Sequence, residues 1–226
     1  MKGGYVPTSD RTYRPSYDPE ISKLFFAMCL IIPASIILAL LLYAEPFHLW
    51  HNAFSQLGET VTVSGTPNAA SRLVFSAGWI ACGIVMLMIA ARYGRNRALR
   101  LRVLKGWLAL LGGIGFFIAI TPNDLNHLLH SIGMGIGVGV MYFFAILLLF
   151  ELRPRISRFV FFANITLLHG VVLTYAVAFF ANSDYKQLAQ KFCILGLLLV
   201  MERMVTIAPE GFEWRSVFEA LRRSSK

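Results

Sequence analysis

The chain has 226 residues, of which 57% are hydrophobic and 15% are charged, and its formal net charge is +9 at pH 7. A soluble domain is about 45–50% apolar and about 25% charged, so this composition excludes an ordinary soluble protein and predicts a polytopic membrane protein. The positive charge does not indicate nucleic-acid binding, because the basic residues cluster between apolar runs and no nucleic-acid-binding motif accompanies them.

Six apolar runs follow one another along the chain. A bilayer core of about 30 Å requires about 20 apolar residues in a helix. The runs that approach or exceed this length are Lys23–Ala44, Ser71–Tyr93, Gly106–Thr121, Leu125–Leu152, Phe159–Ala181 and Leu188–Ile207. The first run is interpreted as an uncleaved span, because Leu42 stands where a signal-peptide cleavage site requires a small residue. We therefore predict an all-α fold, a polytopic membrane protein built as a six-transmembrane-helix bundle.

The basic residues predict the orientation of these spans. Lys2, Arg11, Arg14 and Lys23 lie before or at the start of the first span, and the loop from Arg92 to Lys105 holds six basic residues and no acid. The segment "RPRISR" and the C-terminal tail are basic as well, whereas the loop over 45–70 has neither Lys nor Arg. By the positive-inside rule both termini are cytoplasmic. The predicted organisation is a cytoplasmic tail (1–22), a transmembrane domain (23–207) with a long outer loop (45–70), and a cytoplasmic amphipathic tail (208–226).

Polar residues gather on the predicted outer side of the membrane. "HLWH" places His48 and His51 after the first span, and "HLLH" places His127 and His130 at the start of the fourth, just beyond Asp124. Residues three apart share one face of a helix, so Asp124, His127 and His130 can form a stripe. We predict an outward-facing polar pocket for lipid headgroups or a small ligand, with these candidate residues: Ser55, Glu59, Asn123, Asp124, His127, His130 and His169.

Two other interpretations of this stripe stay open. Imidazole and carboxylate ligands suit Zn²⁺, and a zinc-bound water could attack a lipid ester or amide with Glu59 or Asp124 as the base. The candidate metal ligands are His48, His51, Asp124, His127 and His130. Alternatively, the histidines are ordinary interface residues and Asp124 caps the fourth span.

The fourth and fifth spans carry two further signals. The segment "GMGIGVGV" contains the GxxxG pairs Gly133/Gly137 and Gly135/Gly139 on roughly opposite helix faces, which predicts close helix packing on both sides. His169 lies near the middle of the fifth span, where an ionisable residue is a candidate for function. His130 and His169 differ in depth, so bis-histidine haem is not expected, and we predict no cofactor outside the zinc alternative.

Three short motifs carry a family resemblance. A Ser-x-Leu-Gly element ("FSQLGE") follows the first span, a Pro-Asn pair ("GTPNAAS") leads into the second, and a histidine follows the turn "TPNDLN" at the fourth. Over about residues 24–207 the chain resembles the bacterial domain-of-unknown-function 998 family. It is also distantly similar to the family of the FGF-receptor-activating protein and the autophagy modulator DRAM. Gln56 stands where that pattern has an acid.

This resemblance implies six membrane spans and a role in lipid organisation or membrane signalling. The predicted function is therefore a non-enzymatic integral protein of the cell membrane, a bacterial inner membrane by this resemblance. Its expected partners are membrane lipids and other membrane proteins, with which it would form a membrane complex. The alternative is a metal-dependent membrane lipid hydrolase that uses the outer His/Asp cluster. The sequence contains neither a nucleotide-binding loop nor a Gly-x-Ser-x-Gly elbow.

Overall fold

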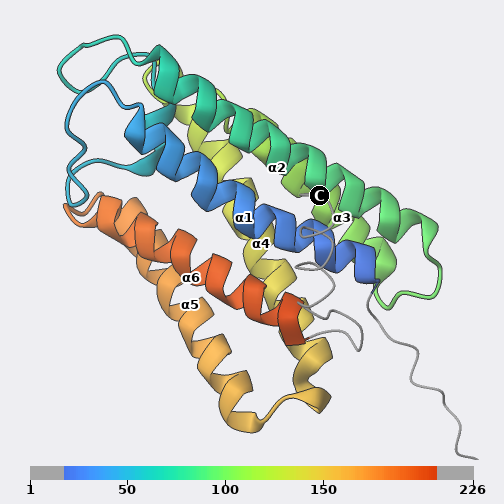
Figure 1. The fold of residues 1–226 in the computed structure, drawn as a ribbon. Coiled ribbons are helices and arrows are strands. Elements are labelled where there is room, and N and C mark those ends of the chain that lie inside the picture. Colours follow the sequence, from blue (N-terminus) through green and yellow to red (C-terminus); the bar gives the residue numbers. More distant parts are fainter. Residues whose placement is uncertain (1–17, 208–226) are drawn as a thin grey trace, which may run out of the picture.

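Residues 18–207 are described by a computed structural model and form six long helices and two short 3₁₀ helices (Figure 1). The all-α prediction is confirmed. In chain order the elements are α1 (Pro19–Leu41), η1 (Phe54–Gly58), α2 (Ala69–Arg95), α3 (Arg102–Ile118), α4 (His127–Leu152), η2 (Arg153–Arg155), α5 (Arg158–Phe180) and α6 (Lys186–Ile207).

Four of these helices are long and apolar enough to cross a membrane, namely α1, α2, α5 and the continuous segment His127–Arg155. The predicted count of six spans is therefore wrong by this criterion. Helix α3 has 17 residues, which gives a length of only about 25 Å at about 1.5 Å per residue. Helix α6 is long but carries Lys186, Lys191, Glu202 and Arg203. The chain is a helical membrane protein in which α3 and α6 depart from the simplest spanning pattern.

Capping side chains fix the starts of α1, α4 and α5. Helix α1 begins at Pro19, ahead of the predicted Lys23, because Asp18 Oδ1 accepts a hydrogen bond from Glu20 N at 3.0 Å. At α4, Asn126 Oδ1 accepts from Leu129 N at 3.0 Å. The prediction that Asp124 caps this helix is therefore wrong. The predicted amphipathic tail, 208–226, lies outside the described residues.

Small residues bring neighbouring helices close together at several interfaces. A Cβ atom added to Gly78 of α2 would overlap the side chain of Ser35 on α1. One added to Gly133 of α4 would overlap the backbone of Ala119, which follows α3. These glycines are needed because any larger side chain would push the helices apart, as is general for helix packing in membranes.

The GxxxG prediction holds on only part of α4. Gly133 packs tightly on the end of α3, but a Cβ added to Gly137 would meet nothing within 4 Å. The same is true of Gly135 and Gly139. Close packing is therefore confirmed on the Gly133/Gly137 face, where a Cβ added to Gly115 of α3 would also overlap the backbone of Gly137, and is wrong on the Gly135/Gly139 face. The open space beside the Gly137 Cα belongs to a cavity described below.

The helices form two groups. Helices α1, α2, α3 and α4 pack successively on one another, while α5 and α6 form a hairpin that contacts the rest mainly through α6 against α1 and α4 (Figure 1). Loops 42–68, 119–126 and 181–185 lie together at what we call the polar end. The opposite end, which carries 92–105 and 153–158, is called the basic end.

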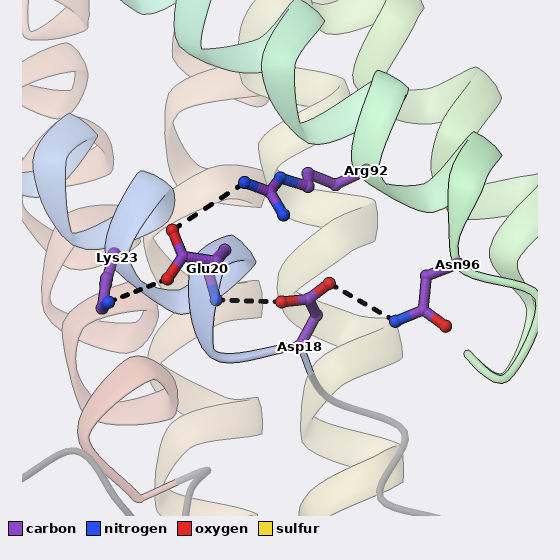
Figure 2. Close-up of polar contacts among 5 residues, drawn as sticks. All are labelled: Asp18, Glu20, Lys23, Arg92 and Asn96. Atoms are coloured by element: carbon purple, nitrogen blue, oxygen red, sulfur yellow. Dashed lines mark hydrogen bonds and ion pairs between the residues drawn. The ribbon is translucent and has the colours of Figure 1, made fainter.

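At the basic end, the start of α1 is joined to the end of α2 (Figure 2). Asn96 Nδ2 donates to Asp18 Oδ2 at 3.4 Å, and Glu20 lies 2.8 Å from Lys23 Nζ and 3.9 Å from Arg92 Nη2. These groups are largely exposed, so each pair contributes little to stability. Glu20 is therefore the ion-pair partner of both Lys23 and Arg92.

A buried ion pair lies deeper at the same end. Lys105 Nζ on α3 is 2.6 Å from Glu151 Oε2 on α4, and the two side chains are 0% and 7% exposed. The Lys105 ammonium also lies 5.5 Å from the centre of the Tyr93 ring on α2. The pair therefore links three helices, and neither charge has water as an alternative partner.

Candidate functional site: a polar network above an apolar cavity

The Ser-x-Leu-Gly element and the Pro-Asn pair contact each other directly. Asn68, which is 1% exposed, donates through Nδ2 to the carbonyl oxygens of Gln56, Leu57 and Glu59 at 3.2–3.4 Å. Ser71 Oγ donates to the Leu57 carbonyl at 3.0 Å. The two motifs are therefore one structural unit that folds η1 onto the start of α2.

Asp124 holds the loop before α4 against the segment after η1. Its Oδ2 accepts from Thr60 N at 2.9 Å, from the Thr60 hydroxyl and from Val61 N at 3.3 Å. Burial opposes ionisation of Asp124, but these hydrogen bonds outweigh it and lower the pKa of Asp124 below its ordinary value. Asp124 is thus a positioning residue for the loop.

Glu59, Asn123 and His127 form a chain of hydrogen bonds beside Asp124. Asn123 Nδ2 donates to Glu59 Oε1 at 2.9 Å, and His127 Nδ1 lies 2.7 Å from Asn123 Oδ1. Burial raises the pKa of Glu59, the hydrogen bond from Asn123 opposes this shift, and the charge of Asp124 adds to it. We call Glu59, Thr60, Asn123, Asp124 and His127 the polar network.

His130 lies below this network and is 5% exposed. Its Nδ1 is 2.9 Å from the Thr121 carbonyl oxygen, and since a carbonyl can only accept, Nδ1 donates. The prediction places His130 in a cavity under the outer loop; in the structure its ring bonds to the segment after α3, and it is not among the residues that line the apolar cavity described below. Its Nε2 is buried without a partner in the described part of the chain.

The remaining predicted residues lie apart from one another. His48 and His51 are exposed in the loop before η1, and Ser55 is half-buried on η1. His169 on α5 contacts Tyr142 on α4 with ring centres 5.4 Å apart, and its Nδ1 lies 2.8 Å from the Ile165 carbonyl of its own helix. The structure therefore does not gather the seven predicted pocket residues into one polar pocket.

The predicted metal ligands likewise do not converge. Among residues 18–207, no group of three or more His, Cys, Asp or Glu side chains lies close enough to hold a metal ion. The physical reason is the late start of α4, which leaves Asp124 outside the helix and out of register with His127 and His130. The described geometry gives no support to the zinc-hydrolase interpretation.

Lys191 of α6 is a buried cation that sequence analysis did not single out. It is 6% exposed, and its Nζ donates to the carbonyls of Asn52 at 2.6 Å and Gln187 at 3.1 Å. The ammonium lies 5.1 Å from the ring centre of Phe54 and 5.9 Å from that of Phe47. Lys191 therefore connects α6 to the loop 42–68 by a hydrogen bond and by contacts with two aromatic rings.

An apolar cavity lies in the half of the bundle nearest the polar end. Its volume is about 50 Å³, and it is lined by five helices or their ends. The lining residues are Ile32, Trp79, Phe116, Ala119, Gly133, Met134, Gly137, Val138, Met141, Ile194, Leu197 and Leu198. The cavity therefore lies where the α5–α6 hairpin meets the other four helices.

Among the residues that line the cavity, Trp79 is the one whose side chain carries a nitrogen or oxygen atom. Its ring is 3% exposed and packs against Phe75 and Phe116, with ring centres 4.7 Å and 5.8 Å away. Its Nε1 is buried and makes no hydrogen bond in the described part of the chain. A buried donor without an acceptor is costly, so an oxygen atom at this position would be favourable.

Comparisons with protein-family models, curated proteins and solved structures gave no match to this chain. The family resemblance therefore stays a prediction, and the functional argument rests on the chain's own geometry.

Proposed function

We propose that this protein is a non-enzymatic membrane protein whose apolar cavity receives the end of a lipid acyl chain. In this proposal the four long apolar helices cross the bilayer, α3 and α6 pack beside them in the same bundle, and both termini are cytoplasmic. Two observations support this arrangement. Helix α3 packs between α2 and α4 along its length (Figure 1), and the basic residues gather at the end that the positive-inside rule assigns to the cytoplasm.

The cavity carries the proposal. Its lining side chains are all apolar apart from the indole N–H of Trp79, and several of them, including Met134, Val138 and Leu198, are only partly buried. At this depth in a membrane the neighbouring molecules are lipid chains. A lipid chain that enters between α4 and α6 would bury apolar surface, which favours binding.

The glycines of α4 allow a direct test. Gly137 lines the cavity and Gly135 does not, yet both have open space where a Cβ would lie. The side chain of Gly137→Leu should project into the cavity and occupy part of it, and Gly135→Leu is its matched control. With a phosphatidylcholine that carries a photoreactive diazirine on its acyl chain, the wild type should cross-link at the cavity residues of α4 and α6.

Gly137→Leu should reduce this cross-linking several-fold, whereas Gly135→Leu should leave it at the wild-type level. The thermal melting temperature in detergent should be unchanged or raised for both variants, since leucine favours helix more than glycine. Equal cross-linking in the wild type and Gly137→Leu, mapped to the same peptides, would refute a lipid site in the cavity.

A further inference from the structure

A second hollow lies at the basic end, between α2 and α3. It is an open groove of about 430 Å³. Small residues on both helices leave this space: Ala90, Ala91 and Gly94 on α2, and Gly106 on α3. A Cβ added to Gly94 would meet nothing within 4 Å. The remaining lining is Leu87, Tyr93, Arg102, Val103, Trp107 and Leu110, so the groove is apolar along most of its length and cationic at one point.

Arg102 supplies that cationic point. Its Nη1 donates to the Gly94 carbonyl at 3.3 Å across the groove, which leaves its other guanidinium donors for a ligand. The neighbouring Arg95, Arg97 and Arg100 are exposed. Within residues 18–207 these four arginines form no ion pair.

The other two cations of this segment already have partners. Arg92 lies 3.9 Å from Glu20 (Figure 2), and Lys105 is buried against Glu151. The segment 92–105 contains no acid of its own. The acids of the described chain therefore neutralise the two ends of this cationic segment and leave its centre, beside the groove, positive.

The start of α3 adds to this positive potential. Its N-cap, Leu101, provides no side-chain hydrogen bond, whereas Asp18, Asn126 and Ser157 cap α1, α4 and α5. The first backbone N–H groups of a helix carry partial positive charge and favour anions. At α3 no side chain of the cap residue competes for them.

We propose that this groove binds one anionic phospholipid. Its acyl chain would lie along the small residues between α2 and α3, and its phosphate would meet Arg102 and the loop that carries Arg97 and Arg100. Trp107, which is 66% exposed, lies where indole rings commonly meet the headgroup region. A zwitterionic lipid would fill the groove equally well but would neutralise less of the positive charge. The site is separate from the Trp79 cavity and does not depend on it.

The test uses the full chain in detergent with equal amounts of phosphatidylglycerol and phosphatidylcholine that have the same acyl chains. Native mass spectrometry then measures the ratio of the two bound lipids. The wild type should prefer phosphatidylglycerol. Arg102→Gln should lower that preference about fivefold, the effect of about 1 kcal/mol for one cation at an anionic surface. Arg158→Gln, which removes a charge at the start of α5, is the matched control and should have no effect.

A second pair of variants tests the chain-binding part of the groove. Gly94→Leu should reduce binding of both lipids, because leucine occupies the open space, and Gly170→Leu on the exposed side of α5 should not. Excess glycerol 3-phosphate should not displace the lipid, because it lacks a chain. Gly137→Leu should leave the ratio unchanged, which separates this site from the cavity.

Three results would overturn the proposal. The first is an equal loss of preference in Arg102→Gln and Arg158→Gln, which would show diffuse attraction to charge. The second is complete displacement by glycerol 3-phosphate, which would show a site for free phosphate. The third is a wild type that binds both lipids equally.

Discussion

At the polar end of the bundle, amides and carboxylates bond to the protein's own backbone, whereas at the basic end most arginines of the α2–α3 segment face outward without an acid. Asn68 and Asp124 each receive or supply three hydrogen bonds within the chain. Arg97 and Arg100 are exposed. The comparison shows that a cluster of polar residues indicates a ligand only where the chain leaves their hydrogen-bonding groups or charges unmatched.

The largest loss of stability is expected at the buried pair of Lys105 and Glu151. This is the one place at the basic end where a buried cation is matched by an acid within the described residues. Lys105→Met leaves Glu151 buried without its cation, which should cost about 3–5 kcal/mol of unfolding free energy. Unfolding by sodium dodecyl sulfate in mixed micelles measures this change. The double variant Lys105→Met/Glu151→Leu should recover most of the loss, because an apolar pair replaces the ion pair. A double variant no better than the single one would contradict a coupled pair.

A smaller loss of stability is expected from removing one asparagine side chain at either end, Asn68 at the polar end or Asn96 at the basic end. Asn68→Ala removes three hydrogen bonds from buried carbonyl groups and should lower the unfolding free energy by about 2–3 kcal/mol. Asn96→Ala removes two hydrogen bonds, the 3.4 Å donation to Asp18 Oδ2 and the 3.1 Å bond that Asn96 Oδ1 accepts from Ala98 N, at a half-buried position. This change should cost about 1 kcal/mol. Equal losses of unfolding free energy for Asn68→Ala and Asn96→Ala, in the same assay, would contradict a stronger hydrogen-bond network at the polar end.

The smallest effect is a difference in pH dependence within the polar network. The folded-state pKa of Glu59 is raised, so its ionisation disfavours folding, and its contribution to stability increases as pH falls toward its unfolded pKa of about 4.3. The pKa of Asp124 is lowered, so its contribution is present above the unfolded pKa of about 3.9 and is lost as pH falls below it.

Two isosteric variants separate these contributions. Melting temperatures are measured between neutral pH and about pH 3. Glu59→Gln should remove the rise in melting temperature on mild acidification, and Asp124→Asn should remove the fall in melting temperature at the lowest pH values. Glu59→Gln keeps an oxygen that can accept from Asn123. Melting curves with the wild-type pH profile in both variants would show that neither carboxyl is coupled to folding.

Much of the helical architecture follows from the sequence, because apolar runs separated by polar or basic loops specify membrane helices directly. The number of spanning helices does not follow as simply. Short α3 is flanked by Lys105 near one end and by the Pro122 turn after the other, and the charges of α6 become understandable only from their partners. Lys191 is a clear case, since its carbonyl partners include Asn52, far away in the sequence.

The candidate site was less predictable than the fold. The stripe of Asp124, His127 and His130 assumed that the helix includes Asp124, and the better cap at Asn126 shifts its start. The GxxxG spacing likewise identified small residues but not their surroundings. Gly133 lies against the backbone of Ala119, whereas the space at the Cβ position of Gly137 is part of a cavity. Spacing along one helix gives the face of a residue but not what the neighbouring helix places opposite it.

The attachment of the first loop to α6 has a consequence for the order of synthesis. Phe54 N donates to Gln190 Oε1 at 2.9 Å, and Lys191 binds the carbonyl of Asn52. The loop is translated early, but these partners follow well over a hundred residues later, and membrane helices enter the bilayer in the order in which they are made. The loop before α2 therefore reaches its final conformation only after α6 has been made, so closure of the polar end requires α6 to be in place.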